Sequence, residues 1–219
     1  MKTFLRILKY LGLGLGAFVV LLVLNYLLFA LVMTRVSEGE PIGDRDPDRA
    51  GLLVLDIQEG PTGERSANAS FQDQAGRLIP LLNETIRYAV ERGIPVVYVR
   101  SEVANPGINF LNSTMAKGSE GAQLDERLEQ GAGPVLVKHG NDSFRSGELD
   151  AWLEDWGVGR VILTGLDASQ CVMATAKGAL NRGYRVDVLT DAVITSDAAT
   201  LPDILEEYRA LGITGIDGL

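Results

Sequence analysis

Hydrophobic and polar positions follow two different patterns in this chain, one before and one after residue 36. Residues 10–33 contain no charged side chain and consist mainly of Leu, Val, Phe and Gly. A helix rises 1.5 Å per residue, so about 24 residues extend about 36 Å, enough to cross the apolar core of a bilayer with some tilt. We therefore predict a membrane-spanning helix at 10–33.

After residue 50, short apolar runs alternate with segments of helical periodicity. The apolar runs are typical of buried strands in parallel sheets, and they lie at 51–57, 95–99, 134–138, 160–164 and 184–189, with a short edge strand at 213–216. Helices are predicted at 73–92, 120–130, 147–156, 170–181 and 198–211. Within the first of them, Pro80 predicts a kink or a later start near Ile79. This alternation predicts a three-layer α/β/α fold with a doubly wound, mainly parallel, Rossmann-like sheet.

The chain of 219 residues is long enough for one domain of ordinary size and an additional segment. We predict three parts. Residues 1–36 form a membrane anchor, residues 37–50 form a linker rich in Gly, Pro, Asp and Arg, and residues 51–219 form the α/β domain.

The N-terminal segment has a competing interpretation as a cleavable signal peptide. The apolar core of such a peptide is about 7–15 residues long and precedes a small-x-small cleavage site. Here the apolar run is longer, and Leu28-Phe29-Ala30 lacks the first small residue. We therefore favour an uncleaved signal anchor that passes through the membrane once.

Charge favours one orientation of this anchor and limits the partners of the domain. Lys2, Arg6 and Lys9 precede the span more densely than the arginines that follow it. The positive flank is expected to stay in the cytoplasm, which places the α/β domain on the extracytoplasmic side. All 29 Asp and Glu residues follow the span, together with all but three of the 20 Lys and Arg residues. This acidity counts against nucleic acid and anionic lipid surfaces as partners.

The span itself offers one sign of self-association. Gly12 and Gly16 form a G-x-x-x-G pair, and Asn25 lies further along the same segment. Small residues at this spacing allow two membrane helices to pack closely, and an Asn can hydrogen-bond across such a contact. A glycine-tolerant single helix explains the same residues, so a homo-oligomer is one of two interpretations.

Three chemically active side chains are expected at one edge of the sheet. Asp56, Lys138 and Cys171 each lie at or just beyond the carboxyl end of a predicted strand, where open α/β sheets bind ligands. Singly they have plain explanations: a turn residue, a solvated charge and a small buried hydrophobe. Cys171, the only cysteine, falls in the first turn of a predicted helix with Ser169 as its N-cap. That position and Lys138 predict a thiol pKa below about 8.5, although an ionised Asp56 would act in the opposite direction.

Three motifs resemble those of the isochorismatase-like cysteine hydrolases. They are LVLDIQ at 53–58, VKHGNDSF at 137–144, and TGLDASQCV at 164–172 followed by Thr175-Ala176. The resemblance extends from about residue 51 to about residue 198. It implies that Cys171 is the nucleophile, Asp56 the base that takes its proton, and Lys138 the cation that orients and stabilises the pair. It also implies a cis peptide between Leu166 and Asp167, with the backbone amides of Asp167 and Cys171 forming an oxyanion hole.

One departure from the family concerns metal binding. Its nicotinamidase branch holds a metal with an Asp-x-His pair and a further His after the second strand, whereas residues 100–104 here read RSEVA. His139 is the only histidine, and one His does not make a usual zinc or iron site. We therefore expect no metal and no cofactor. His139, Gln58, Phe110 and Phe144 are candidates for the pocket wall, although core packing or surface exposure explains them equally well.

The resemblance implies a hydrolase with a small-molecule substrate. The isochorismatase branch proper hydrolyses a vinyl ether and often lacks the cysteine, so Cys171 favours amide, ureido or imide C–N bonds. The alternatives are vinyl-ether hydrolysis and a catalytically silent binding module of the same fold. A Rossmann-type nucleotide binder is disfavoured because no G-x-G-x-x-G follows the first strand. Residues 59–71 and 101–121 are the expected pocket loops, but they identify no substrate.

Overall fold

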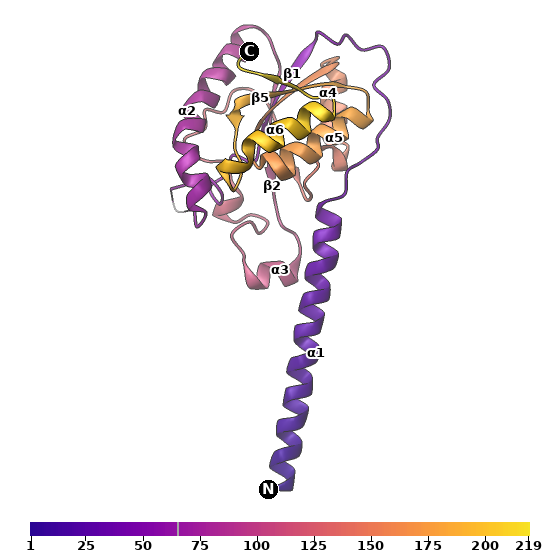
Figure 1. Ribbon diagram of the computed structural model, residues 1–219, viewed down its shortest axis with the longest axis vertical. Helices are drawn as coiled ribbons and strands as arrows, with labels where there is room; N and C mark the ends of the chain where they lie inside the picture. Colours follow the sequence, from indigo (N-terminus) through magenta and orange to yellow (C-terminus); the bar gives the residue numbers. More distant parts are fainter. Residues whose placement is uncertain (65) are drawn as a thin grey trace.

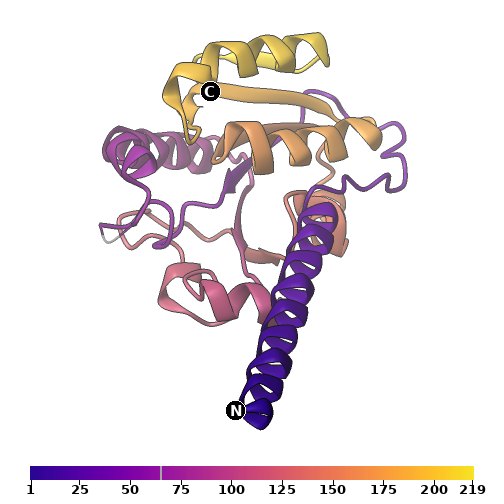
Figure 2. The same ribbon diagram turned by 60° about the horizontal axis from the view of Figure 1, so that its bottom comes forward.

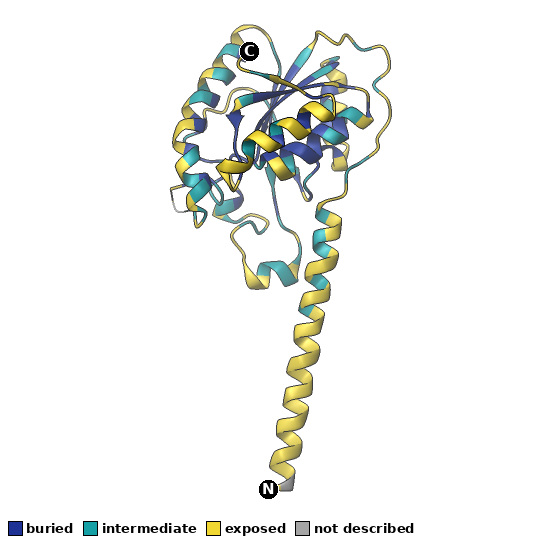
Figure 3. Ribbon diagram, viewed as in Figure 1, coloured by how far each residue is buried: buried dark blue, intermediate teal, exposed yellow. Residues whose placement is uncertain are grey.

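The computed structural model describes residues 1–64 and 66–219. A single long helix, α1 (Lys2–Met33), projects from an α/β domain (Figure 1). It is the one helix of the described chain that is long and apolar enough to cross a membrane. Most of its length is exposed (Figure 3), so α1 is not a core helix of the domain.

The domain is built on one sheet of six parallel strands. These are β1 (Ala50–Leu55), β2 (Val96–Ser101), β3 (Val135–Lys138), β4 (Arg160–Gly165), β5 (Arg185–Val193) and β6 (Thr214–Ile216). Their order is β3-β2-β1-β4-β5-β6, so the chain starts in the centre and winds outward in both directions. The predicted doubly wound parallel fold is confirmed. The switch of direction lies between β1 and β4, where such sheets bind ligands.

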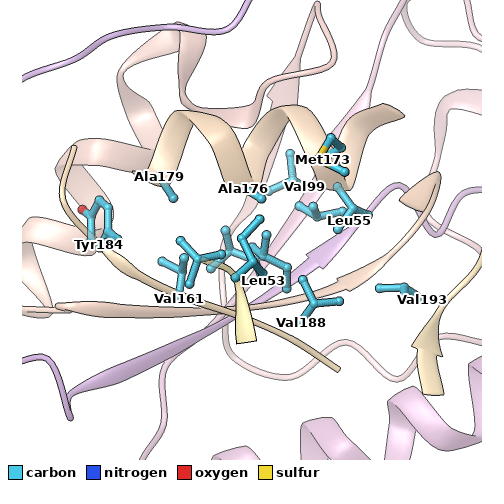
Figure 4. Close-up of a cluster of buried hydrophobic side chains, with 14 of the residues drawn as sticks. Leu53, Leu55, Val99, Val161, Met173, Ala176, Ala179, Tyr184, Val188 and Val193 are labelled. Atoms are coloured by element: carbon cyan, nitrogen blue, oxygen red, sulfur yellow. The ribbon is translucent and has the colours of Figure 1, made fainter. Parts of the chain in front are cut away.

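Helices cover both faces of this sheet. They are α2 (Ala69–Glu91), α4 (Glu148–Asp155), α5 (Met173–Asn181) and α6 (Leu201–Ala210), with the short α3 (Pro106–Leu111) outside the layers. Side chains of a strand alternate between faces. Leu52 and Val54 of β1 therefore pack against α2, whereas Leu53 and Leu55 pack in the core under α4, α5 and α6. Figure 4 shows this second core, including Leu53, Val161 and Ala176.

One helix prediction needs correction at its start and another is wrong. The helix predicted at 73–92 is α2, which begins at Ala69, before the predicted 73 and the alternative start near Ile79, because the Asn68 side chain accepts the Phe71 N–H at 3.1 Å. Pro80 is accommodated within this helix. At 120–130 the structure has only a single 3₁₀ turn, Glu120–Ala122. The chain beyond it instead folds around the buried Asp125 carboxylate, which binds the Arg127 guanidinium at 2.7 Å.

Helix α3 was not predicted from the sequence. Asn105 caps it by accepting the Ile108 N–H at 3.0 Å, and Pro106 is its first residue. An Asn-Pro pair is a typical helix start, so this signal was available, but the helix is too short for periodicity to show.

The segment predicted as a linker lies against the domain. The Ser37 N–H and hydroxyl both donate to Asp142 Oδ2, at 2.8 and 2.6 Å. Further along, the Ile42 N–H donates to the Arg182 carbonyl oxygen at 2.9 Å. These bonds hold the connection between α1 and β1 in a defined position.

Candidate active site

Asp56, Lys138 and Cys171 meet at the carboxyl edge of the sheet. Asp56 follows β1, Lys138 ends β3, and Cys171 follows β4 in the helical turn η3 (Ala168–Val172). Lys138 Nζ lies 2.9 Å from Asp56 Oδ2 and donates to Cys171 Sγ at 3.1 Å. The structure thus brings together all three candidates that the sequence indicated.

A fourth side chain, Ser101, joins this group and was not predicted. Its hydroxyl donates to Asp56 Oδ1 at 2.8 Å and accepts from Lys138 Nζ at 2.7 Å. Ser101 ends β2 and is paired in register with Lys138 on β3. A polar residue at the end of a central strand was the available signal, and only the strand register shows which group it faces.

Backbone conformation fixes the position of the carboxylate. Asp56 has a φ of +57°, the only positive φ at a non-glycine residue in the described chain. Its N–H donates to the Val99 carbonyl oxygen at 2.8 Å. A left-handed conformation at such a residue costs about 1–3 kcal/mol and is retained only where its surroundings enforce it. Gly165 on β4 allows the backbone just before Asp56 to approach closely, since a Cβ at residue 165 would overlap the Leu55 carbonyl oxygen.

The Cys171 thiol is protonated in this environment. Burial raises its pKa, the Asp56 carboxylate raises it further, and the Lys138 ammonium opposes both, so that the pKa is about 12. The expectation of a thiol pKa below 8.5 is therefore wrong, because burial and Asp56 outweigh Lys138. For Lys138 itself burial acts against the charge, but Asp56 and Cys171 outweigh burial and raise its pKa.

The Asp56 carboxylate can accept the thiol proton. In the described chain, Asp56 Oδ2 has its ion pair with Lys138 but no hydrogen bond of acceptable geometry. A lone pair of this oxygen is therefore available. The resting site is a neutral thiol beside a carboxylate that can accept its proton.

The turn that carries Cys171 is capped differently from the prediction. Asp167, not Ser169, is the N-cap, and its Oδ1 accepts the Ser169 N–H at 2.7 Å and the Thr195 hydroxyl at 3.0 Å. Cys171 lies in a π-helical turn, and the regular helix α5 begins only at Met173. The shorter side chain of Ser169 instead donates to the same Asp167 oxygen.

The backbone amides near the Cys171 sulfur differ in their hydrogen bonding. The peptide bond between Leu166 and Asp167 is cis. The N–H groups of Gln170 and Val172 both donate to the Asp167 carbonyl oxygen, at 3.0 and 3.1 Å. Among the described residues, the Cys171 N–H does not donate to that oxygen.

Two of the four candidate pocket residues belong to the interior. Gln58 is fully buried; its side chain donates to the Ser101 and Ala122 carbonyl oxygens and accepts the Ser101 N–H. Phe144 is buried against Tyr184, with its ring centroid 4.6 Å from the Arg182 guanidinium. Packing and hydrogen bonds account for both side chains, and a role in the pocket wall stays a prediction.

The other two candidates are exposed. Phe110 lies on α3, with 73% of its surface accessible. His139 directs Nδ1 to the Glu102 carbonyl oxygen at 2.9 Å. The residue beside the sulfur is instead Asn141, whose Oδ1 lies 3.9 Å from Cys171 Sγ and whose Nδ2 donates to Gln170. Asn141 belongs to the VKHGNDSF motif, but the sequence did not predict its place beside the sulfur.

A cavity of about 810 Å³ lies between the two expected pocket loops, with Glu59, Phe71, Met115 and Arg127 among the residues that line it. The three candidates at the sheet edge do not line this cavity.

The residues after β2 do not fit a metal. The Glu102 carboxylate is paired with the Arg100 guanidinium at 2.8 Å, and the His139 ring is engaged by backbone. Within the described residues, no three His, Cys, Asp or Glu side chains come together in a metal-binding group.

Comparison with known proteins now assigns the chain. The model of the isochorismatase domain matches residues 50–216. The chain belongs to the isochorismatase family. It is 28% identical over 152 residues to the uncharacterised isochorismatase family protein YddQ of Bacillus subtilis, covering 66% of this chain and 77% of that protein. It is 26% identical over 162 residues to nicotinamidase 3 of Arabidopsis thaliana, covering 69% and 77%.

A solved structure supports the same assignment. N-carbamoylsarcosine amidase from Thermoplasma acidophilum superimposes with a TM-score of 0.65 at 30% identity, covering 76% of this isochorismatase-family chain and 95% of the amidase. The family includes hydrolases of amides and related C–N bonds, and this chain is a hydrolase.

Proposed function

We propose that this isochorismatase-family chain is a membrane-anchored cysteine hydrolase that cleaves an amide, ureido or imide C–N bond of a small molecule without a metal. The observation that carries the proposal is the position of Lys138 Nζ, within 3.1 Å of both Asp56 Oδ2 and Cys171 Sγ. This places a proton acceptor, a cation and a thiol in one contact group. The nicotinamidase and amidase relatives support the choice of a C–N bond.

In the proposed reaction, Asp56 takes the thiol proton as the sulfur attacks the substrate carbonyl carbon. A C–S bond forms, and the carbonyl electron pair moves to the oxygen, which the amides of Asp167 and Cys171 stabilise. The protonated Asp56 then gives its proton to the leaving nitrogen, and the C–N bond breaks. Water hydrolyses the thioester, and its proton passes through Asp56 back to the sulfur. Lys138 stabilises the negative charge that moves between Asp56 and Cys171.

The test of this chemistry uses the purified full chain in detergent. Amides, ureides and isochorismate are screened, and rapidly quenched samples are analysed by intact-protein mass spectrometry. We expect turnover of a C–N substrate and a thioester on wild-type Cys171, with Cys171→Ala giving neither. Turnover of isochorismate at an undiminished rate by Cys171→Ala would favour vinyl-ether hydrolysis. If the chain bound one of these compounds tightly but turned over none of them, a catalytically silent binding module would be favoured.

The membrane part of the proposal rests on α1. Its large apolar side chains are exposed along the helix, Leu21 by 65% and Leu31 by 66% of their surface. Such a surface is typical of contact with lipid rather than water. Residues 37–50 connect this anchor to the hydrolase domain at 51–219, and the positive N-terminal flank favours an extracytoplasmic domain.

Carbonate extraction of membranes tests the anchor. The full-length chain is expected in the pellet, with its mass unchanged at the N-terminus. A soluble, shortened chain would show that the segment is a cleaved signal peptide. Protease added to intact spheroplasts is expected to digest the domain, and protection from it would reverse the orientation.

A further inference from the structure

Helix α3 lies beside α1, away from the layers of the domain. Both views show it next to the membrane-spanning helix (Figures 1 and 2). The Phe110 ring contacts the Phe18 ring edge to face, with centroids 6.4 Å apart. Gly107 approaches Asn25 so closely that a Cβ would lie 2.6 Å from Asn25 Oδ1. Helices α1 and α3 are thus in direct contact.

The position of this contact along α1 decides whether α3 can reach the membrane. Phe18 and Asn25 both lie within the uncharged stretch 10–33. Phe18 precedes the end of α1 at Met33 by about 22 Å at 1.5 Å per residue. The apolar core of a bilayer is about 30 Å thick, and the uncharged stretch is about 36 Å long. A bilayer that surrounds this stretch therefore also reaches α3.

The surface of α3 suits that environment. Phe110 and Leu111 expose 73% and 62% of their surfaces. Residues 103–116 contain no charged side chain, in contrast to the strongly acidic remainder of the domain. Within this segment the Asn109 amide N–H donates to the Val103 carbonyl oxygen at 2.9 Å, whereas Asn109 Oδ1, like Asn25 Oδ1 on α1, is buried without a hydrogen-bond partner among the described residues. At the level of Phe18, exposed apolar side chains on an uncharged segment suit contact with the apolar chains of the lipid.

The attachment of α1 to the domain is defined by hydrogen bonds at its end. The Asn141 N–H donates to the Met33 carbonyl oxygen at 2.9 Å, and Arg145 donates to the Val32 carbonyl oxygen at 2.6 Å. Asn141 also lies beside Cys171. The end of the anchor, α3 and the sulfur therefore belong to the same edge of the sheet.

We infer that α3 is a second membrane-contacting element, whose partner is the lipid of the bilayer that α1 crosses, and that it seats the catalytic edge on the membrane surface. This inference rests on the proposed membrane anchor. The acidic domain disfavours anionic lipid, and the level of Phe18 along α1 places the contact of Phe110 among the apolar chains.

The test places a fluorescent label at single cysteines in the full chain, in a Cys171→Ala background that removes the native thiol. The chain is reconstituted in phosphatidylcholine vesicles that contain nitroxide-labelled lipid. Leu21→Cys reports on α1 and Phe110→Cys on α3. Trp156→Cys is the matched control: it is an exposed aromatic position, 45% accessible, just before β4 and so at the opposite edge of the sheet.

We expect strong quenching by lipid nitroxides at positions 21 and 110, and little at 156. Iodide in the aqueous phase is expected to quench in the reverse order. Quenching at 21 alone would leave the anchor in place and overturn the role of α3. Quenching at neither position, with the protein outside the vesicle fraction, would overturn the anchor and the inference that rests on it.

Discussion

Replacing Asp56 with Asn should slow turnover and, at the same time, speed alkylation of Cys171. The substitution keeps the size of the side chain but removes its charge and its ability to accept a proton. Burial and the Asp56 charge raise the thiol pKa, and Lys138, 3.1 Å from the sulfur, opposes them. Without the carboxylate, Lys138 acts against burial alone, so the thiol pKa falls and the thiolate population rises.

The structure gives the magnitude. A rise of the thiol pKa from 9.0 to about 12 favours the thiol by about 4 kcal/mol, or a factor of about 10³ in thiolate population. Wild-type Cys171 should therefore react slowly with iodoacetamide at neutral pH, and its reaction rate should still increase above the ordinary thiol pKa. Loss of the base in Asp56→Asn should reduce turnover by about 10²–10⁴.

The assay follows single-adduct formation by intact-protein mass spectrometry, without substrate, from neutral to alkaline pH. Turnover is measured on the same preparations. Asp203→Asn, an exposed change of the same kind on α6, is the matched control and should alter neither rate. If Asp56→Asn slowed both alkylation and turnover, Asp56 would be generating the thiolate rather than suppressing it, and the electrostatic argument would fail.

Three further predictions follow from the same edge of the sheet. Lys138→Ala should abolish most turnover and lower the free energy of unfolding by about 3–5 kcal/mol, because it leaves the buried Asp56 carboxylate without its cation. Urea unfolding measures the loss of stability, and an unchanged midpoint would contradict the prediction. Gly165→Ala should destabilise the fold, since φ is +105° and a Cβ would overlap the Leu55 carbonyl oxygen; thermal unfolding tests it, with Gly76→Ala, which has open space, as the control. Dialysis against a strong chelator should leave turnover unchanged, and a loss reversed by Zn²⁺, Mn²⁺ or Fe²⁺ would show that a metal site was missed.

The sequence predicted the sheet well because its strands are central and buried. A continuous apolar run such as 51–55 has few alternatives to a parallel strand, and the carboxyl ends of parallel strands share one edge. That rule alone brought Asp56, Lys138 and Cys171 together. It did not find Ser101, because its contact with both Asp56 and Lys138 depends on the register between β2 and β3.

Properties that depend on packing could not be predicted in the same way. The sequence showed a lysine and a helix start near Cys171, and both lower a thiol pKa, but it did not show how deeply the sulfur is buried beside Asp56. Similarly, periodicity predicted a helix at 120–130, whereas the need to satisfy the buried Asp125 with Arg127 and Thr62 determines the conformation there. In both cases burial and side-chain contacts that the local pattern does not show outweigh that pattern.

The end of α1 is a structural part of the candidate site rather than a separable tether. Its last carbonyl groups accept hydrogen bonds from Asn141 and Arg145, and Ser37 just beyond it binds Asp142. These three partners follow Lys138 in the same loop, and Asn141 lies beside the Cys171 sulfur. Removing residues 1–36 would leave the Asn141 N–H and the Arg145 guanidinium without these acceptors, within a few residues of the nucleophile. The segment proposed as the membrane anchor therefore also supports the loop on which the proposed chemistry depends.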